Sequence, residues 1–385
     1  MQACGVIVEY NPFHNGHVYH LEKARALSNA EIVVAVMSGN FLQRGEPAII
    51  DKWKRAEAAL ANGADLVIEL PIEWAVQSAD YFAQGAVSIL QALQCDSLCF
   101  GTDSQEAFDY EKFGHLMLTK KDQMNQIYQE MNQPNLSYPE QMSLVMQRSF
   151  PEMFLGENGP NHILGLSYSQ ANSQYSKPLK LIPLQRKQAS YHSKEIIGAI
   201  ASATAIRHAL KEKGTIMQVV PRETAVSLQE YQVVWEDFWP YLKYQLTIRS
   251  HADLKQIYQM NEGIEYRLKE AGKQAHHFAE FIQLVKTKRY TQTRIQRLCC
   301  YLLLGIKKAE ISAAWEKKYI HVLGFTAAGK NYLKKVKKES DLPILSRIGK
   351  QEAQDYPLMV RGDQVYQMAK TTISEQNFGR FPLQK

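Results

Sequence analysis

Short apolar runs alternate with more polar, helix-prone stretches through the first half of the chain. The apolar runs contain few polar residues and end near Gly, Asn or Pro, so they predict strands buried on both faces, at residues 4–10, 32–37, 65–71 and 96–101. Helical patterns lie between them, at about 17–28, 51–62 and 78–93. In the second of these, Asp51 is expected to be the N-cap and Asn62-Gly63 the stop signal.

This alternation predicts βαβ units, a parallel sheet and a ligand site at the carboxyl ends of its strands. A further strand at 180–186 is expected to complete the sheet, and polar residues 106–150 indicate a helical insertion. Beyond Pro221 the pattern becomes helical, at 226–248, 253–273, 275–287 and 292–305. We therefore expect an α/β catalytic domain, residues 1–215, followed by a mainly α-helical domain, residues 216–385.

Composition places the chain among globular proteins. Its 385 residues exceed one ordinary domain of about 150 residues, and 45% of them are hydrophobic. No apolar run approaches the roughly 20 residues that span a bilayer, and no basic region precedes the first apolar run. The five cysteines show no metal-ligand pairing and fit a reducing compartment, so we expect a cytoplasmic protein.

Charge is distributed unevenly along the chain. Residues 1–215 hold 18 basic and 22 acidic residues (net −4), and residues 216–385 hold 27 and 17 (net +10), which together give the total of +6. A basic C-terminal part favours a polyanionic partner, nucleic acid before membrane. A merely solvated basic surface remains the alternative.

The stretch from Val8 to His17, VEYNPFHNGH, carries the most chemical information. It leaves a predicted strand, turns through Asn-Pro and Asn-Gly, and enters a helix near His17. Two imidazoles, His14 and His17, thereby meet the backbone N–H groups of a helix N-terminus, where a phosphate chain is favoured. Two histidines at this spacing can alternatively bind a metal or satisfy a loop.

Other segments are candidates for the same site. Ser202 to Arg207 (SATAIR) places hydroxyls and an arginine at a helix start, which suits phosphate. Gly101 in FGTD lets an adenine or ribose lie against the backbone. Asn161 in PNHILG and Arg186 in LQR are further candidates. Asn161 is equally compatible with an N-cap role. The polar segment 38–47, with Asp51, Lys52 and Arg55, either closes over substrate or forms a plain surface loop.

A basic segment in the C-terminal part is the candidate nucleic-acid contact. It has no acidic residue, and its five cations are Lys286, Lys288, Arg289, Arg294 and Arg297. Arg294 and Arg297 are expected on one helix face, with Tyr290 available to stack on a base. A solvated basic face, or arginines packed against acidic groups of the first domain, are the alternatives.

Several motifs together resemble bacterial tRNA(Met) cytidine acetate ligases: VEYNPFHNGH, MSGNFLQRGEPA, DKWKRAEAAL, FGTDS, PNHILG, ASATAIR and KRYTQTRIQR. The similarity runs from the first strand to beyond residue 320. It implies a Rossmann-like parallel sheet of the HxGH nucleotidyltransferase type. It also implies that ATP and acetate form acetyladenylate, whose acetyl group moves to N4 of the wobble cytidine of elongator tRNA(Met), giving N4-acetylcytidine.

The resemblance also implies site residues. His14 and His17 would be catalytic, Mg²⁺ would accompany ATP, and no residue is assigned as a metal ligand or to the acetate pocket. Ala203 replaces a hydroxyl usual in the superfamily, which puts one phosphate contact in doubt. No membrane or stable protein partner is implied. The ATP site would comprise Ile7, Val8, Glu9, Tyr10, Asn11, Pro12, Phe13, His14, Asn15, Gly16, His17, Val18, Tyr19, His20, Gly101, Asn161, Arg186, Ser202, Thr204 and Arg207.

Two other functions stay open. A nucleotidyltransferase that joins a nucleotide to a phosphorylated small molecule would use the same motif, although it would not need the basic helical part. A non-catalytic RNA-binding protein would keep the fold as a scaffold, and both histidines argue against it.

Overall fold

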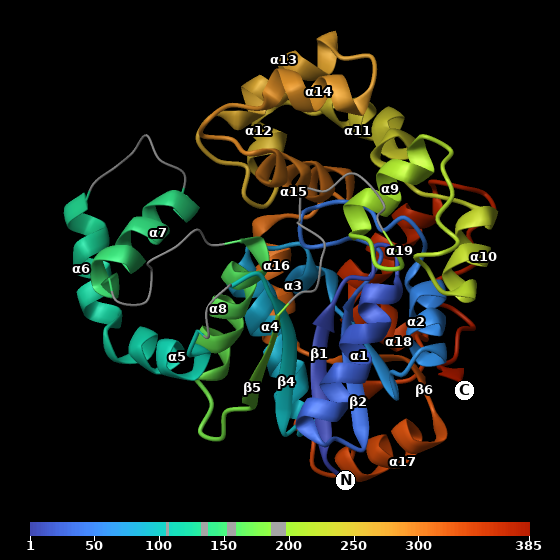
Figure 1. The fold of residues 1–385 in the computed structure, drawn as a ribbon. Coiled ribbons are helices and arrows are strands. Elements are labelled where there is room, and N and C mark those ends of the chain that lie inside the picture. The colour runs from blue at the N-terminus through green and yellow to red at the C-terminus, as the bar shows by residue number, and fades with distance from the viewer. Residues whose placement is uncertain (105–107, 132–137, 152–158, 186–197) are drawn as a thin grey trace.

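A computed structural model describes residues 1–104, 108–131, 138–151, 159–185 and 198–385. A twisted sheet lies at the centre of this structure, with helices on both faces (Figure 1). Five strands run parallel: β1 (Ala3–Val8), β2 (Ile32–Ser38), β3 (Leu66–Leu70), β4 (Ser97–Thr102) and β5 (Lys180–Gln185). These are the five predicted strands, and their parallel pairing confirms the predicted fold class.

Helices cover both faces of these strands because their residues are apolar on both sides. Side chains of β1 such as Val6 pack with Leu21 and Trp53 on one face, and Ile7 packs with Leu90 on the other. The helices of this part are α1 (Asn15–Ser28), α2 (Lys52–Ala61), α3 (Ile72–Ala75), α4 (Ala79–Ala92), α8 (Pro160–Asn172) and α9 (Ala203–Lys211). The predicted insertion is helical, with α5 (Tyr110–Thr119), α6 (Lys121–Met131) and α7 (Tyr138–Ser149).

Strand β5 is not the last strand along the chain to join the sheet, so the prediction that residues 180–186 complete it is wrong. Three later strands join it: β6 (Ile320–Phe325), β7 (Ile344–Leu345) and β8 (Leu383–Gln384). Strand β6 pairs antiparallel with β3, and the order is β5-β4-β1-β2-β3-β6-β7, with β8 beside β6. The chain returns from the helical part to the free edge of β3, where its apolar run completes the backbone pairing.

The predicted helical C-terminal part is present, with two breaks. Residues 226–248 form two helices because Tyr231 is extended: its hydroxyl donates to Asp51, and the N–H of Val233 donates to the carbonyl of Ile49. Residues 253–273 also divide, around Gly263 in the left-handed region. The helices are α10 (Arg222–Glu230), α11 (Trp235–Ile248), α12 (His251–Lys255), α13 (Ile264–Gln274), α14 (Phe278–Val285), α15 (Gln292–Leu303), α16 (Lys308–Glu316), α17 (Ala327–Val336), α18 (Lys350–Asp355) and α19 (Pro357–Gln367).

The group α11–α15 lies beyond the carboxyl ends of β1 and β4 (Figure 1). Its core is continuous with Phe41, Ile49 and Ile50 from the segment after β2. The helical part therefore packs directly on the edge of the sheet where a ligand site is expected, and the division of the chain near residue 215 stays a prediction. Across the described ranges, every helix is too short or too polar to cross a membrane.

Candidate nucleotide-binding site

A cavity of about 750 Å³ opens at the carboxyl ends of β1, β4 and β5. This is the edge at which open α/β sheets bind ligands. The cavity brings together most of the predicted ATP-site residues, from four separate parts of the chain. Those in its wall are Ile7, Val8, Glu9, Tyr10, Asn11, His14, Gly16, His17, Tyr19, His20, Gly101, Asn161, Ser202, Thr204 and Arg207.

The two histidines are placed by the start of α1. His14 is the N-cap, and its Nδ1 accepts the backbone N–H of Gly16 at 3.1 Å. His17 is the third helical residue, and its Nδ1 accepts the backbone N–H of His14 at 3.2 Å. This is a capping box built from imidazoles in place of the usual hydroxyl and carboxylate. The helix therefore begins two residues before the predicted start.

The same hydrogen bonds define which imidazole nitrogen carries the proton. A nitrogen that accepts an N–H cannot itself be protonated, so the proton of each ring lies on Nε2. The rings stack with centroids 3.7 Å apart, and His17 also packs edge-on against Tyr10. Both rings belong to the cavity wall, where an Nε2–H can donate to an anion.

A second helix start faces the same cavity. Ser202 caps α9 by accepting the N–H of Ala205, as the sequence predicts. Arg207 donates to the backbone carbonyl of Asn11 at 2.7 Å and lies 3.7 Å from Glu46. The arginine thereby connects α9 to the turn that precedes His14, and it adds positive charge to the wall.

Asn161 is positioned by a residue that the sequence reasoning did not assign. Gly159, not Asn161, is the N-cap of α8, so the alternative interpretation of Asn161 as an N-cap is wrong. Asp103, just after β4, accepts both the backbone N–H and the side-chain amide of Asn161 at 2.9–3.0 Å. In the sequence, the signal for this contact was the acidic residue of the FGTD segment.

Some predicted ATP-site residues shape the turn without lining the cavity. Phe13 is fully buried against Tyr10 and His17. Asn15 donates to the carbonyls of Ala199 and Gln218, whereas Pro12 is buried and Val18 packs on the core. Arg186 lies outside the described residues.

The segment after β2 is neither a plain surface loop nor a lid carrying Lys52 and Arg55. Both of these side chains are fully buried. The Arg55 guanidinium donates to carbonyls at the ends of β1 and β2, those of Glu9, Ser38 and Gly39, and to the carbonyl of Ile50. These hydrogen bonds hold together the ends of β1 and β2 that border the cavity. Three residues within the predicted segment 38–47 do line the cavity: Gln43, Arg44 and Glu46.

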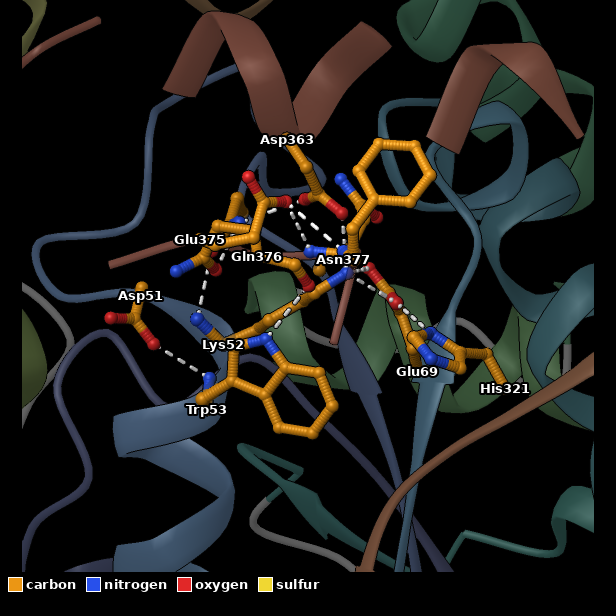
Figure 2. Close-up of polar contacts among 12 residues, drawn as sticks. Asp51, Lys52, Trp53, Glu69, His321, Asp363, Glu375, Gln376 and Asn377 are labelled. Carbon is orange, nitrogen blue, oxygen red and sulfur yellow. Dashed lines mark hydrogen bonds and ion pairs between the residues drawn. The ribbon is translucent and has the colours of Figure 1, made fainter. Parts of the chain in front are cut away.

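Lys52 belongs to a buried polar cluster, defined here as Asn40, Lys52, Glu69, His321, Asp363 and Gln376 (Figure 2). Its ammonium lies 2.8 Å from Glu69 and 2.5 Å from Asp363. His321 contacts the same Glu69 carboxylate at 2.6 Å, and Asn40 donates to Asp363 and Gln376. The buried polar cluster joins α2, β3, β6, α19 and the C-terminal segment.

Electrostatics in this cluster follow from burial and pairing. Burial opposes the charge of Lys52, but Asp363 and Glu69 outweigh burial and raise its pKa. Burial also opposes the charge of Glu69, but Lys52 and His321 hold the pKa of this carboxyl to about 2. Lys52 and Glu69 therefore form an ion pair at neutral pH, and this ion pair is buried inside the protein.

The basic segment is only partly as predicted. Lys286, Lys288 and Arg289 are exposed, as a nucleic-acid contact requires. Arg289 and Arg294 lie 3.2–3.3 Å from Glu262, which belongs to the helical part and not to the first domain.

Two side chains of this segment point into the protein. Tyr290 is buried and its hydroxyl donates to the Glu262 carbonyl, so its predicted availability for stacking is wrong. Arg297 is half-buried and donates to the carbonyl of Gln77, at the interface between α15 and the first domain. Packing of α15 against the first domain accounts for its position.

Comparison with known proteins agrees with this geometry. The family model described as HIGH Nucleotidyl Transferase matches residues 1–380. The tRNA(Met) cytidine acetate ligase of Streptococcus agalactiae is 46% identical over 99% of this chain and 97% of that protein. The ligase of the same name from Latilactobacillus sakei is 41% identical, over 100% and 97%.

Solved structures give the same result. Apo TmcAL of Thermotoga maritima has a TM-score of 0.91 and 30% identity, covering 100% of this chain and 99% of its own. TmcAL bound with alpha-thio ATP has a TM-score of 0.89 and 30% identity, with 100% coverage of both chains. The chain is thus a nucleotidyltransferase-fold enzyme of the HIGH family. Within that family it belongs to the tRNA(Met) cytidine acetate ligases.

Proposed function

We propose that this chain uses ATP to activate acetate as acetyladenylate and then acetylates N4 of the wobble cytidine of elongator tRNA(Met). The product is N4-acetylcytidine. The observation that carries the proposal is the imidazole capping box of His14 and His17 in the wall of a cavity of about 750 Å³. The names of the relatives support the tRNA substrate, and the TmcAL structure bound with alpha-thio ATP supports the nucleotide.

In the first half-reaction, ATP lies in the cavity with its triphosphate at the start of α1. An acetate oxygen attacks the α-phosphorus, a new P–O bond forms, and the bond to pyrophosphate breaks. His14 and His17 donate from Nε2 to the departing pyrophosphate, on which negative charge develops. The N-terminus of α9 and Arg207 add donors on the other side. No covalent enzyme intermediate is needed.

Mg²⁺ is part of the proposal as the companion of the triphosphate. Among the described residues, no three His, Cys, Asp or Glu side chains are grouped as metal ligands. Phosphate oxygens and water would therefore supply most of its ligands, which suits an ion that keeps several waters. Bound there, it would neutralise phosphate charge.

In the second half-reaction, the cytidine reaches the acetyladenylate from the side of the helical part. An anticodon loop is single-stranded, so its base can leave the stack at modest cost. We assign phosphate contacts to Lys286, Lys288, Arg289 and Arg294, whose charges lie at or near the surface. Arg297 was predicted in this set, and its half-buried position favours a role at the interface with the first domain. Acetate and tRNA(Met) are the only partners proposed, and the cytoplasm is the proposed location.

The direct test incubates the protein with ATP, labelled acetate and unmodified tRNA(Met). We expect label in the RNA as N4-acetylcytidine, and no label when ATP is omitted. Pyrophosphate release with pantetheine or nicotinate phosphates, independent of acetate, would instead indicate a small-molecule nucleotidyltransferase. Failure of ATP to raise the melting temperature, together with unlabelled RNA, would indicate a non-catalytic RNA-binding protein.

A further inference from the structure

One carboxylate in the described part of the cavity wall makes no ion pair with any side chain that the structure describes. Glu9 lies one residue beyond the end of β1, and its side chain is partly exposed in the cavity. Its Oε1 accepts the backbone N–H of Gln43 at 2.7 Å. Its Oε2 makes no hydrogen bond with any residue that the structure describes.

The acetyl-transfer step creates a demand for such a group. When the exocyclic amine of cytidine attacks the acetyl carbon, a C–N bond forms and the C–O bond to AMP breaks. The amine must lose a proton during this step, so a base within reach accelerates it. Besides Glu9, the described cavity wall contains histidines, tyrosines and Glu46.

The two histidines of the capping box are unsuited to it. Nδ1 of His14 and of His17 each accepts a backbone N–H, which leaves the proton on Nε2. The second ring nitrogen, Nε2, is therefore a donor. It can stabilise pyrophosphate but cannot remove a proton.

The same holds for four more titratable groups of the wall, Glu46, Tyr10, Tyr168 and His20. Glu46 forms an ion pair with Arg207 at 3.7 Å. Burial raises the pKa of Tyr10 and Tyr168, so both phenols stay protonated. Burial lowers the pKa of His20 to about 4, which makes its imidazole a weak base.

Glu9 has the complementary environment. Burial raises the pKa of this carboxyl above its usual range, the Gln43 N–H opposes that rise, and the nearby charges are Glu46, Arg44 and Arg55. Arg55 approaches from α2 and donates to the Glu9 carbonyl, and Tyr168 approaches from α8. A carboxylate with a raised pKa is a stronger base than one in water.

We infer that Glu9 is the general base of the acetyl-transfer step, a role that rests on the proposed function. Its carboxylate accepts one proton from the cytidine amine as the C–N bond forms. AMP leaves with the electron pair of the broken C–O bond, and the protonated Glu9 returns its proton to solvent after product release. Gln43, by donating to Oε1, orients the carboxyl so that Oε2 faces the cavity.

The test separates the two half-reactions in Glu9→Gln, which keeps the shape and the hydrogen bond from Gln43. Because Glu9 also lines the ATP cavity, acetate-dependent exchange of pyrophosphate into ATP should fall in this variant, but far less than acetyl transfer does. Single-turnover transfer of the acetyl group to tRNA should fall by about 10²-fold or more, the usual effect of a general base. The wild-type transfer rate should rise with pH through the Glu9 pKa, and that rise should be absent in Glu9→Gln. Glu9→Asp should keep the rise at a reduced rate.

Three results would overturn the inference. In the first, Glu9→Gln lowers exchange and transfer equally, as a residue that positions ATP would. Glu46→Gln is the comparison for this behaviour, because it perturbs Arg207 and should slow both half-reactions together. In the second, Glu9→Gln transfers acetyl at the wild-type rate. In the third, wild-type protein leaves tRNA unacetylated, which also removes the proposed function. The first two results leave the proposed function standing.

Discussion

The cavity and the buried polar cluster contain the same kinds of side chain and differ in what those side chains can still do. Both bring together histidine, carboxylate and cationic groups. In the cluster, Lys52 contacts both Glu69 and Asp363 within a few ångströms, and burial raises the pKa of Asp363 to about 7. In the cavity, His14 and His17 use Nδ1 for the helix and present a protonated Nε2 to the wall. A place in the wall of a cavity, more than concentration of charge, distinguishes the site.

Replacing Lys52 by Met should have the largest effect, and it is an effect on stability. The substitution leaves Glu69 and Asp363 buried without their cation, which typically costs about 3–5 kcal/mol. Chemical denaturation measures the change. Lys54→Met on the same helix is the control: its partly exposed pair with Glu230 should contribute no more than about 1 kcal/mol. Equal stability of both variants would contradict the contrast between cluster and surface.

His17→Gln should have the largest effect on chemistry. A Gln at this position can still accept the N–H of His14 and preserve the capping box, but it presents no imidazole donor. We expect acetate-dependent pyrophosphate exchange to fall by about 10²–10³-fold, as for loss of one donor to a developing oxyanion. Melting temperature and tRNA binding should stay near wild type. A large loss of stability would show that His17 serves the helix and not the reaction.

Glu73 tests a buried carboxyl that belongs neither to the cavity wall nor to the buried polar cluster. Its Oε2 is buried without a hydrogen bond to any described residue, and burial raises its pKa to about 8. Below pH 4.5 this carboxyl is protonated in both the folded and the unfolded protein and does not reduce stability. As pH rises from 4.5 to about 8, the carboxyl ionises more readily in the unfolded protein, so the folded protein loses stability. Glu73→Gln should remove this loss, so that the variant gains roughly 4 kcal/mol over wild type by pH 8, at about 1.4 kcal/mol for each pKa unit. Stability curves that run parallel across pH would contradict it.

Arg294→Glu should have the smallest effect, confined to RNA. Reversing one phosphate-facing charge should weaken tRNA binding by about tenfold at moderate salt and reduce the salt dependence of binding. Because Arg294 also contacts Glu262, Lys288→Glu is the matched variant without that pair. Pyrophosphate exchange should be unchanged in both. A joint loss of exchange and tRNA binding would contradict the separation of the two activities.

Local patterns predicted the cavity well. The strands that bound it are apolar on both faces, and the caps at Asp51 and Ser202 and the turn before His14 depend on neighbours a few residues away. The correct edge of the sheet followed from the parallel topology. The Asp103 contact with Asn161 needed the structure, because it joins two separate loops.

The cluster was not predictable in the same way. Lys52 and Asp363 are separated by 311 positions, and on its own Lys52 resembles an exposed residue at a helix start. The pairing of β6 with β3 likewise joins distant segments whose apolar patterns do not specify a partner. The extended Tyr231, which interrupts a predicted helix, responds to Asp51 far along the chain. Contacts between residues so far apart in the sequence leave no periodic pattern from which they can be predicted.

The most direct test of the nucleotide site is a crystal structure of the protein with a non-hydrolysable ATP analogue and Mg²⁺. We expect the triphosphate at the start of α1, within hydrogen-bond distance of Nε2 of His14 and His17, with the adenine toward Gly101 and Asn161. A nucleotide bound elsewhere, or histidines directed away from its phosphates, would contradict the assignment of this cavity.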